Sequence, residues 1–430
     1  MKELGQSANT LDDNSPPTER FVQLKMPPTE MRAKGLEANA VGPILVVALA
    51  QLLGTSLWFS ANSAADDLMQ AWGATAADIG LLTGAVQLGF ILGTLTLALS
   101  GIADRFPASR LFVCSAILGA VFNACFALLS KGVLSGVALR FMVGICLAGI
   151  YPLGMKLIVS WNPQRASASL ALLVGMLTLG TALPHALRSI GIGVPWQYVI
   201  FASSALATIA AALIFVLGDG PHLPVALPRQ ALKKSTVLKA FKIPAFRAAS
   251  LGYFGHMWEL YAFWTLVPML VVLTQLDKRI AWGGVSAISF AVIAAGTAGC
   301  LLGGALSRRF GSARVAAAAL ALSGLCCLFF PWVSTNASPV ALLAFLLIWG
   351  AAVVADSPQF SAIASSSCPP QAVGSALAMQ NSAGFAITVV SIAAVTMLFD
   401  RLGPSVSWVL LLGPLLGLIG LHPLLVRRLP

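Results

Sequence analysis

Charged residues are scarce in this chain. Only 10% of its 430 residues are Asp, Glu, Lys or Arg, whereas 58% are hydrophobic. Soluble domains carry roughly 25% charged residues. A water-soluble fold needs a charged surface, and this composition cannot provide one. The scarcity therefore excludes a soluble enzyme and a nucleic-acid-binding protein, and it indicates a protein that crosses a membrane many times.

Cysteine and histidine are also few, and their spacing matches no metal or disulfide pattern. The seven cysteines lie inside or at the ends of apolar runs without a C-x-x-C pair. The four histidines are far apart and have no H-E-x-x-H spacing. We therefore expect no catalytic residues, no metal site and no cofactor, and we interpret the cysteines as small apolar side chains.

The first part of the chain lacks an apolar stretch. Residues 1–39 are polar, with four prolines and charges of both signs. A segment of this composition cannot bury enough apolar surface to fold, and it does not resemble a secretory signal. We expect residues 1–39 to be a disordered cytoplasmic tail.

Apolar runs long enough to cross a bilayer fill the remainder of the chain. A hydrocarbon core about 30 Å thick needs roughly 20 helical residues per crossing. The runs lie at 40–62, 79–101, 109–129, 133–156, 168–188, 196–217, 248–273, 283–305, 313–332, 339–360, 372–397 and 405–426. They form two sets of six around a segment rich in Pro, Lys and Arg. The sequence predicts an all-α polytopic membrane protein with an N-terminal six-helix bundle at 40–217, a cytoplasmic linker at 218–247 and a C-terminal six-helix bundle at 248–430.

Basic residues indicate the orientation. The net charge is +11, and loops rich in Lys and Arg stay in the cytoplasm and face anionic lipid headgroups. Cytoplasmic termini place most basic residues inside, Arg105, Arg110 and Lys233 among them, and leave Lys131 and Arg188 among the few outside. We expect a multi-pass protein of the inner (plasma) membrane, in contact with membrane lipids, with both termini in the cytoplasm.

The segment after the second run carries the most specific motif. It reads Gly101-Ile-Ala-Asp104-Arg105-Phe-Pro-Ala-Ser-Arg110 and resembles the G-x-L-a-D-r-x-G-r-k/r loop of the major facilitator superfamily. Glycine lets helices approach closely, and an aspartate at a helix end can pair with a neighbouring helix. The resemblance implies a conformational latch formed by Gly101, Asp104, Arg105 and Arg110. The alternative is a basic turn that only fixes the topology.

Two further patterns extend this resemblance to essentially the whole chain after residue 40. Arg105-Phe106 has a counterpart, Arg309-Phe310, about half the chain later, and the fourth run contains an R-x-x-x-G-x-x-x-A/G element that begins at Arg140. Duplicated halves are typical of this superfamily. The resemblance implies two pseudo-symmetric six-helix bundles around a central cavity, a monomer, and transport of a small-molecule solute.

Few charged side chains lie inside the predicted spans, where a charge costs free energy unless it has a function or a partner. Arg140 is in the fourth span, Glu259 in the seventh and Asp356 in the tenth. In the superfamily, spans one, four, seven and ten line the central cavity, so the resemblance implies that all three residues lie there. His256 precedes Glu259 by three residues and shares its helix face.

We expect Glu259, His256 and Asp356 to couple transport to protons. A carboxyl group in a cavity that opens to alternate sides can take up and release a proton, and a nearby imidazole can relay it. Two alternatives stay open. Glu259 can form a permanent hydrogen bond to a neighbouring helix, and the segment Asp356-Ser-Pro can mark a helix kink.

Arg140 and four polar or aromatic residues are the candidates for solute binding. Arg140 is expected to face an anionic group, and structural packing is its alternative role. Trp58 and Asn62 of the first span are amphipathic or polar groups that suit the wall of a water-filled cavity. Tyr261 and Trp264 belong to the dense aromatic residues of the seventh span, which suit a substrate cage with hydroxyl and indole donors. For any single ring, packing against other helices is the alternative.

These residues predict a secondary active transporter that moves a small anionic or zwitterionic organic solute by alternating access, coupled to protons. The alternative is proton-driven efflux of cationic or lipophilic compounds attracted by Glu259 and Asp356. A non-transporting membrane sensor or a membrane-embedded enzyme is a more remote alternative, because neither the tail nor the linker is long enough for a folded output domain and the histidines do not cluster.

Overall fold

The computed structural model describes residues 28–191, 193–223, 240–280, 284–368 and 373–426. Within these ranges the regular secondary structure is entirely helical. Residues 1–27 of the predicted tail and 224–239 of the predicted linker lie outside the described residues. The chain divides into one unit at Met1–Asn39 and a second, compact unit at Ala40–Pro430. Helix α1 begins at Pro28, within the segment predicted as a tail.

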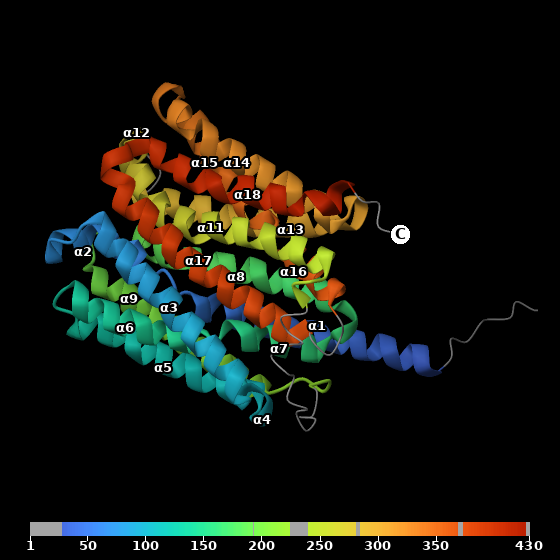
Figure 1. The fold of residues 1–430 in the computed structure, drawn as a ribbon. Coiled ribbons are helices and arrows are strands. Elements are labelled where there is room, and N and C mark those ends of the chain that lie inside the picture. Colours follow the sequence, from blue (N-terminus) through green and yellow to red (C-terminus); the bar gives the residue numbers. More distant parts are fainter. Residues whose placement is uncertain (1–27, 192, 224–239, 281–283, 369–372, 427–430) are drawn as a thin grey trace, which may run out of the picture. The chain divides into compact units, whose positions relative to one another are not determined.

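The first half of the described chain forms the N-terminal set of helices, shown in blue to green in Figure 1. Its elements are α1 (Pro28–Thr55), η1 (Asn62–Ala64), α2 (Ala65–Trp72), α3 (Ala76–Ser100), α4 (Ile102–Arg105), α5 (Ala108–Leu129), α6 (Val133–Leu147), α7 (Tyr151–Trp161), η2 (Pro163–Arg165), α8 (Ala166–Ile190) and α9 (Trp196–Leu217).

The second half forms the C-terminal set, shown in yellow to red in Figure 1. Its elements are α11 (Pro244–Leu273), α12 (Leu276–Arg279), α13 (Gly284–Phe310), α14 (Ser312–Asn336), α15 (Pro339–Ala355), α16 (Ser357–Ser367), α17 (Val373–Leu402), η3 (Gly403–Val406) and α18 (Ser407–Val426).

The helices coincide with the predicted apolar runs. Among the described residues, ten stretches are long and apolar enough to cross a membrane, and the last of them, Ala376–Val426, contains both α17 and α18. The apolar part of α1, Val41–Thr55, is shorter. The prediction of an all-helical, multi-pass membrane protein is confirmed. The count of twelve crossings stays a prediction.

Glycines let the helices pack closely. A Cβ on Gly144 of α6 would lie 2.1 Å from the carbonyl oxygen of Val86 on α3, and one on Gly350 of α15 would lie 1.9 Å from that of Val292 on α13. No side chain fits at such distances, so these backbones touch directly. Small residues at helix interfaces are the usual way in which membrane helices pack without a hydrophobic driving force between them.

Two helix pairs join the sets. Helix α8 packs along α13, and α3 packs along α17, as Figure 1 shows at the middle of the fold. In the α8–α13 seam Thr297 Oγ1 donates to Gly175 O at 3.0 Å. In the α3–α17 seam Gly80 lies directly against Thr396. The packing is close enough that residues 40–430 form a single compact unit, so the predicted division into bundles at 40–217 and 248–430 stays a prediction.

Three predicted spans are interrupted, and the seventh is not. Helix α1 ends at Thr55 before a turn at 56–61, α6 and α7 are separated at 148–150, and α15 and α16 are separated at Asp356. Both α7 and α16 have proline at their second position, where its missing N–H and fixed ring stop the preceding helix from continuing. The kink at Asp356-Ser357-Pro358 that the sequence allowed is therefore present. Helix α11, which is the seventh span, runs without interruption.

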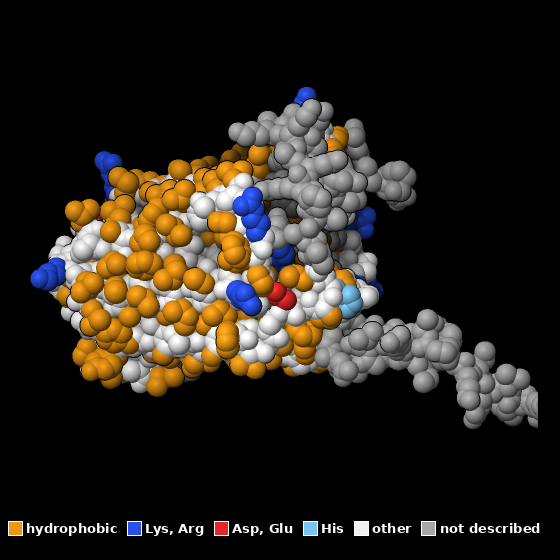
Figure 2. Space-filling view, turned by 90° about the horizontal axis from the view of Figure 1, so that it is seen from below, with side chains coloured by type: hydrophobic (Ala, Val, Ile, Leu, Met, Phe, Trp, Pro, Cys, Tyr) orange, Lys and Arg blue, Asp and Glu red, His pale blue; other side chains and the backbone are white. Residues whose placement is uncertain are grey.

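The outer surface is apolar. Leu134 and Val216 expose 85% and 86% of their surface, and many further large hydrophobic side chains are exposed. Figure 2 shows one face on which hydrophobic side chains spread over most of the described part, with Lys and Arg at its ends and beside the grey region. Such a surface is stable only against lipid, because soluble monomers rarely expose large contiguous apolar patches.

Candidate functional site

An aromatic cluster lies where the two sets of helices meet. We define it as Trp58, Phe59 and Phe90 from the N-terminal set and Tyr261, Trp264 and Phe385 from the C-terminal set. The Trp58 ring centroid lies 5.0 Å from Phe90, 5.5 Å from Tyr261 and 5.8 Å from Phe385. These separations fall in the range of favourable ring pairs. Trp58, Tyr261 and Trp264 were all candidate solute-binding residues in the sequence, and the structure brings these three into one cluster.

Several polar atoms in and beside this cluster have no hydrogen-bond partner in the described part of the chain. Trp58 and Trp264 are fully buried, and the Nε1 atom of each has no hydrogen-bond partner among the described residues. On α3 the fully buried Gln87 precedes Phe90 by three residues, and neither its amide nitrogen nor its amide oxygen has such a partner. Buried donors without partners are uncommon and need an explanation, such as a ligand or water.

Unlike these unpartnered atoms, the side-chain amide nitrogen of Asn62 has a hydrogen-bond partner. Its Nδ2 atom donates to Thr83 Oγ1 of α3 at 2.8 Å, and its side chain is buried at the start of η1. The contact holds the chain after the turn at 56–61 against α3. The prediction that Asn62 binds solute is untested, and the structure gives this residue a packing contact.

Arg140 of α6 is fully buried, and protein oxygens occupy both of its terminal nitrogens. Nη1 donates to Ser60 Oγ at 3.1 Å and to Asn123 Oδ1 at 3.0 Å, and Nη2 donates to Leu57 O at 3.0 Å and to Trp58 O. Both carbonyls belong to the turn that follows α1. A cation near the C-terminal end of a helix is favourable, because the carbonyls there are unpaired.

The residue that completes this arrangement is Asn123 of α5. Its Oδ1 atom also accepts from Ser60 Oγ at 2.8 Å, and its Nδ2 atom donates to Ile200 O and to Ser204 Oγ of α9, each at 3.0 Å. The network of Arg140, Asn123 and Ser60 thus joins α5, α6, α9 and the turn after α1. Of the two roles that the sequence left open for Arg140, the geometry favours the structural one. Sequence reasoning missed Asn123, although an amide in an otherwise apolar run was a visible signal.

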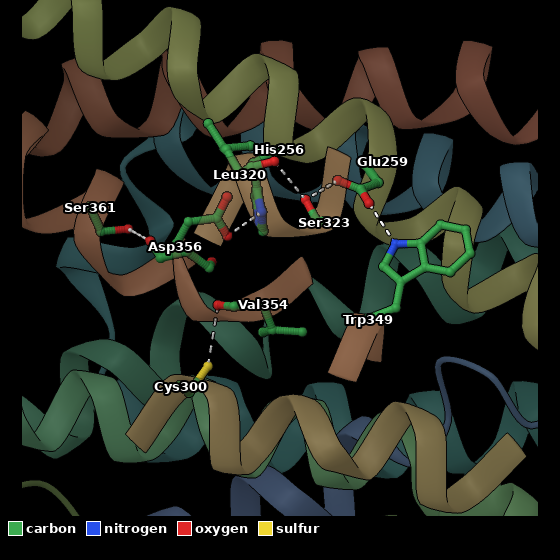
Figure 3. Close-up of polar contacts among 10 residues, drawn as sticks. His256, Glu259, Cys300, Leu320, Ser323, Trp349, Val354, Asp356 and Ser361 are labelled. Carbon is green, nitrogen blue, oxygen red and sulfur yellow. Dashed lines mark hydrogen bonds and ion pairs between the residues drawn. The ribbon is translucent and has the colours of Figure 1, made fainter. Parts of the chain in front are cut away.

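His256 and Asp356 form a buried pair in the C-terminal set. His256 Nδ1 lies 2.8 Å from Asp356 Oδ1, and their side chains are 1% and 2% exposed. Figure 3 shows the two side chains facing each other, His256 from α11 and Asp356 from the interruption between α15 and α16. The pair is close to the seam between the sets, because Cys300 of α13 donates to Val354 O, two residues before Asp356.

Glu259 of α11 is also buried, and three donors from other helices surround its carboxylate. Oε2 accepts from Ser323 Oγ of α14 at 2.8 Å, while Oε1 accepts from Trp349 Nε1 of α15 at 2.8 Å and from Cys327 Sγ of α14 at 3.3 Å. Figure 3 shows the Glu259–Trp349 contact directed away from Asp356. Glu259 therefore ties three helices together, which is the structural alternative that the sequence left open. Sequence reasoning missed these three donors, because serine, cysteine and tryptophan are common in apolar spans and gave no signal.

The predicted latch lies between α3 and α5. Gly101 ends α3 with φ 72°, a left-handed conformation that favours glycine, and Arg105 and Arg110 are exposed. The side chain of Asp104 lies outside the described residues. The latch itself stays a prediction.

Two residues outside the motif hold this loop to the N-terminal set. Lys156 Nζ of α7 donates to Ala103 O at 2.6 Å, and Asp219 Oδ1 accepts from the backbone nitrogen of Ser109 at 2.8 Å. The second contact places a carboxylate at the N-terminus of α5, where it satisfies an unpaired N–H group.

A polar cleft of about 380 Å³ opens at the opposite ends of the helices. Its lining includes Asp66, Asp67 and Gln70 of α2, Arg188 of α8 and Val285 of α13. Arg188 Nη2 forms an ion pair with Asp67 Oδ2 at 2.7 Å. Partial burial raises the pKa of the Asp66 carboxyl above its ordinary value, and the neighbouring Asp67 and Asp277 raise it further, while Arg188 opposes the shift.

Comparison with known proteins agrees with the fold and with the loop motif. A family model described as Major Facilitator Superfamily matches residues 47–392. The chain belongs to the Major Facilitator Superfamily. Among curated proteins, no sequence matches this chain. Among the described residues, no group of three or more His, Cys, Asp or Glu side chains is placed to hold a metal ion.

Solved structures of superfamily transporters resemble this chain in fold. A point mutant of the nucleoside transporter NupG is 15% identical, with a TM-score of 0.67, over 89% of this chain and 98% of its own. A bacterial homolog of the human lysosomal transporter Spinster, in an inward-facing and unoccupied conformation, is also 15% identical, with a TM-score of 0.63, over 90% and 95%. The chain is therefore a multi-pass membrane protein with the fold of superfamily transporters.

Proposed function

We propose that this superfamily member is a proton-coupled secondary active transporter of a small organic solute. The observation that carries the proposal is the buried pair of His256 and Asp356. Burying a carboxylate or an imidazole away from water costs free energy, unless the two groups are paired with each other. Ionisable groups that are kept inside a membrane span often take part in proton transfer. Imidazole and carboxylate can each accept and release a proton, so this contact is suited to proton exchange.

The position of the pair supports its coupling to conformational change. Asp356 lies at the interruption of the tenth predicted span, and His256 lies on the uninterrupted seventh. Helix α13 contacts the segment before Asp356 through Cys300, and it contacts α8 of the other set through Thr297 and Gly175. A rearrangement of the α8–α13 seam therefore changes the surroundings of the pair. Interrupted helices beside binding sites are a recurring feature of secondary transporters.

The contacts of Arg140 bear on the charge of the solute. The expectation of an anionic or zwitterionic solute rested on Arg140, whose terminal nitrogens already bind four protein oxygens. The alternative of cation efflux rested on Glu259 and Asp356, and both carboxylates have protein partners. The geometry thus favours neither charged class, and the proposal retains a small organic solute moved by alternating access.

The proposal includes the location and the oligomeric state of the protein. We place it in the inner membrane with both termini in the cytoplasm, as its basic loops predict. We also propose that it is a monomer, as its resemblance to the superfamily implies. The loop of Gly101, Asp104, Arg105 and Arg110 is proposed to act as the conformational latch.

The test uses the full chain in liposomes loaded with the pH-sensitive dye pyranine. Uridine, adenosine, glutamate, lactate and ethidium are added one at a time, and internal pH and probe uptake are followed together. We expect one probe to move with a change in internal pH, and Asp356→Asn to remove the pH change. The matched control is Asp400→Asn, an exposed carboxyl at the end of α17, which should leave it intact.

A further arm separates the two acidic candidates. Because Glu259 is held by three donors, Glu259→Gln should retain the proton movement in protein that folds. Loss of the pH change in Glu259→Gln but not in Asp356→Asn would transfer the coupling role to Glu259. Probe uptake that ignores an imposed pH gradient in wild type and in both variants would overturn proton coupling.

A further inference from the structure

The aromatic cluster between the two sets of helices carries information about the solute, once the proposed transport function is accepted. Its rings come from both sets, so any molecule bound among them contacts both halves of the protein. Trp58 and Phe385 face each other across the sets with an angle of only 21° between their planes. Phe90 and Tyr261 close the edges, at 4.4 and 5.3 Å from Phe385. Moderate separation of the sets would open a slot between two nearly parallel rings.

The unpartnered polar atoms of the aromatic cluster and of Gln87 on α3 are mainly donors. The indole Nε1 atoms of Trp58 and Trp264 lack partners among the described residues, and an indole nitrogen can only donate. The Gln87 amide, beside Phe90 on α3, can donate and accept. A bound molecule that supplies carbonyl, hydroxyl or ring-nitrogen acceptors would satisfy these groups, each of which is costly to leave unpaired.

Charged groups near the cluster are already paired within the protein. Arg140 approaches Trp58 only through the backbone carbonyl and directs its terminal nitrogens to four oxygens. Asp356 is paired with His256, and Glu259 is held by Trp349, Ser323 and Cys327. An ionised solute group placed among the rings would meet no opposite charge in these contacts, and burying such a charge is strongly unfavourable.

We propose that the aromatic cluster selects an uncharged, planar heteroaromatic solute, whose ring stacks between Trp58 and Phe385. The N–H group of an indole lies in the plane of its ring, so a substituent that extends past the edge of the Trp58 ring accepts from Trp58 Nε1, and a second acceptor of the solute meets Trp264 Nε1. The rings provide stacking, and the two indoles fix the orientation of the acceptors. The amide of Gln87 can form a hydrogen bond with a further polar group on the edge of the solute. The same arrangement disfavours aliphatic acids, whose carboxylate would be buried without an opposite charge. Aromatic faces attract cations, but a cationic group cannot accept a hydrogen bond, so an organic cation would leave the indole N–H groups unsatisfied. This inference rests on the proposed function, because it names the class of solute for the same site.

The test is a binding measurement on the full chain purified in detergent, without a membrane gradient. The probes are uridine, adenosine and caffeine as uncharged planar heteroaromatics, benzoate and ethidium as charged planar controls, and glucose as an uncharged non-planar control. Binding is measured as the rise in unfolding temperature with probe concentration, which follows from the stabilisation of the folded state by ligand. We expect at least one uncharged planar probe to bind and the three controls to have no effect.

Two substitutions test the donors while keeping an aromatic ring. Trp58→Phe and Trp264→Phe remove one N–H group each, and we expect the dissociation constant to rise about five- to tenfold in each, as expected for one lost hydrogen bond. The matched control is Trp332→Phe in α14, because Trp332 is 66% exposed and should leave binding unchanged. The unfolding temperature of each variant without probe is measured first, so that a folding defect is recognised. If one of the two indole variants does not fold, the dissociation constant of the other tests the proposal.

Three results would overturn the proposal: no uncharged planar probe binds the wild type, a charged control binds in preference, or both indole variants bind as the wild type does. None of these results depends on a pH gradient. Failure here therefore leaves the proton-coupling experiment standing, and failure of proton coupling leaves this one standing.

Discussion

His256 Nδ1 lies 2.8 Å from Asp356 Oδ1, and this contact joins a continuous helix to the break in its neighbour. The two residues are far apart in the sequence and become neighbours because α11 packs along α16. The break at Asp356 leaves the ends of α15 and α16 inside the protein, where the buried carboxylate would be costly without a partner. The contact between His256 and Asp356 thus gives the carboxylate at the helix break a partner and holds α11 against α16.

The first prediction concerns His256. Glutamine can donate a hydrogen bond to Asp356 but does not titrate, so His256→Gln should fold and should lose the pH dependence that imidazole confers. We expect solute exchange across proteoliposomes to depend less on pH in this variant than in the wild type. The control is His422→Gln, since His422 is exposed on α18. Equal pH profiles in wild type and His256→Gln would contradict the role of the pair.

Arg140 gives a prediction about stability. Arg140→Ala removes the Arg140 donor from Trp58 O, and it leaves Leu57 O and Asn123 Oδ1 to share the hydroxyl of Ser60. Each hydrogen bond from a charged donor that is lost costs roughly 1.5–3 kcal/mol. We expect the free energy of unfolding to fall by about 3 kcal/mol or more in total, measured by thermal or denaturant unfolding in detergent. Arg140→Lys should recover only part of it, because an ammonium group cannot reproduce the planar fork.

The control for this prediction is Arg401→Ala at the exposed end of α17, which should change stability little. A stable Arg140→Ala protein that loses anion uptake alone would restore the solute-binding role expected from the sequence. For the same reason, transport by Arg140→Ala is informative only after its folding has been measured.

Two glycines on α13 form a matched pair for packing. A Cβ on Gly299 would lie 2.0 Å from the Ala351 carbonyl oxygen, whereas one on Gly304 would make only an ordinary 3.9 Å contact with Ala171. Gly299→Ala should destabilise the protein by about 1–3 kcal/mol through overpacking. Gly304→Ala should be neutral or stabilising by up to about 1 kcal/mol, because alanine favours the helix. Equal unfolding temperatures for the two variants would show that α13 and α15 do not pack this closely.

The raised pKa of Asp66 leads us to expect that the stability of the protein depends on pH through the polar cleft that Asp66 lines. Its pKa is raised in the folded protein by burial and by Asp67 and Asp277, so the folded state holds its proton to a higher pH than the unfolded state. Stability therefore falls as pH rises through the folded pKa. Asp66→Asn removes this loss and should raise the unfolding temperature at pH 7.

The gain from Asp66→Asn should vanish at pH values below the ordinary range of an aspartate, where Asp66 is protonated in both states. The effect should be small, because the residue is partly exposed and solvent screens its charge. A gain that persists at low pH would show that the side-chain amide, and not the removed charge, stabilises the cleft.

Composition and residue pattern were enough to identify the class of protein and the short list of unusual residues. Scarce charge and repeated apolar runs require a membrane environment, because the backbone of each run can satisfy its hydrogen bonds there only as a helix. The loop at Gly101–Arg110 and the charges within the spans were visible for the same reason: a polar residue stands out in an apolar run. Arg140, His256, Glu259 and Asp356 were all found in this way, and all four are buried.

The contacts of those residues depend on how the helices pack in three dimensions, which the pattern of residues does not indicate. A membrane helix is apolar towards lipid and also towards its neighbours, so the period of its hydrophobic residues does not indicate which face meets which helix. The partners of Glu259 come from α14 and α15, those of Arg140 come from α5 and the turn after α1, and Asp356 meets His256. Direct backbone contact at glycines such as Gly144 and Gly350 sets how each helix is turned. That rotation satisfies the charges inside the protein and leaves the indole N–H groups of Trp58 and Trp264 without partners among the described residues.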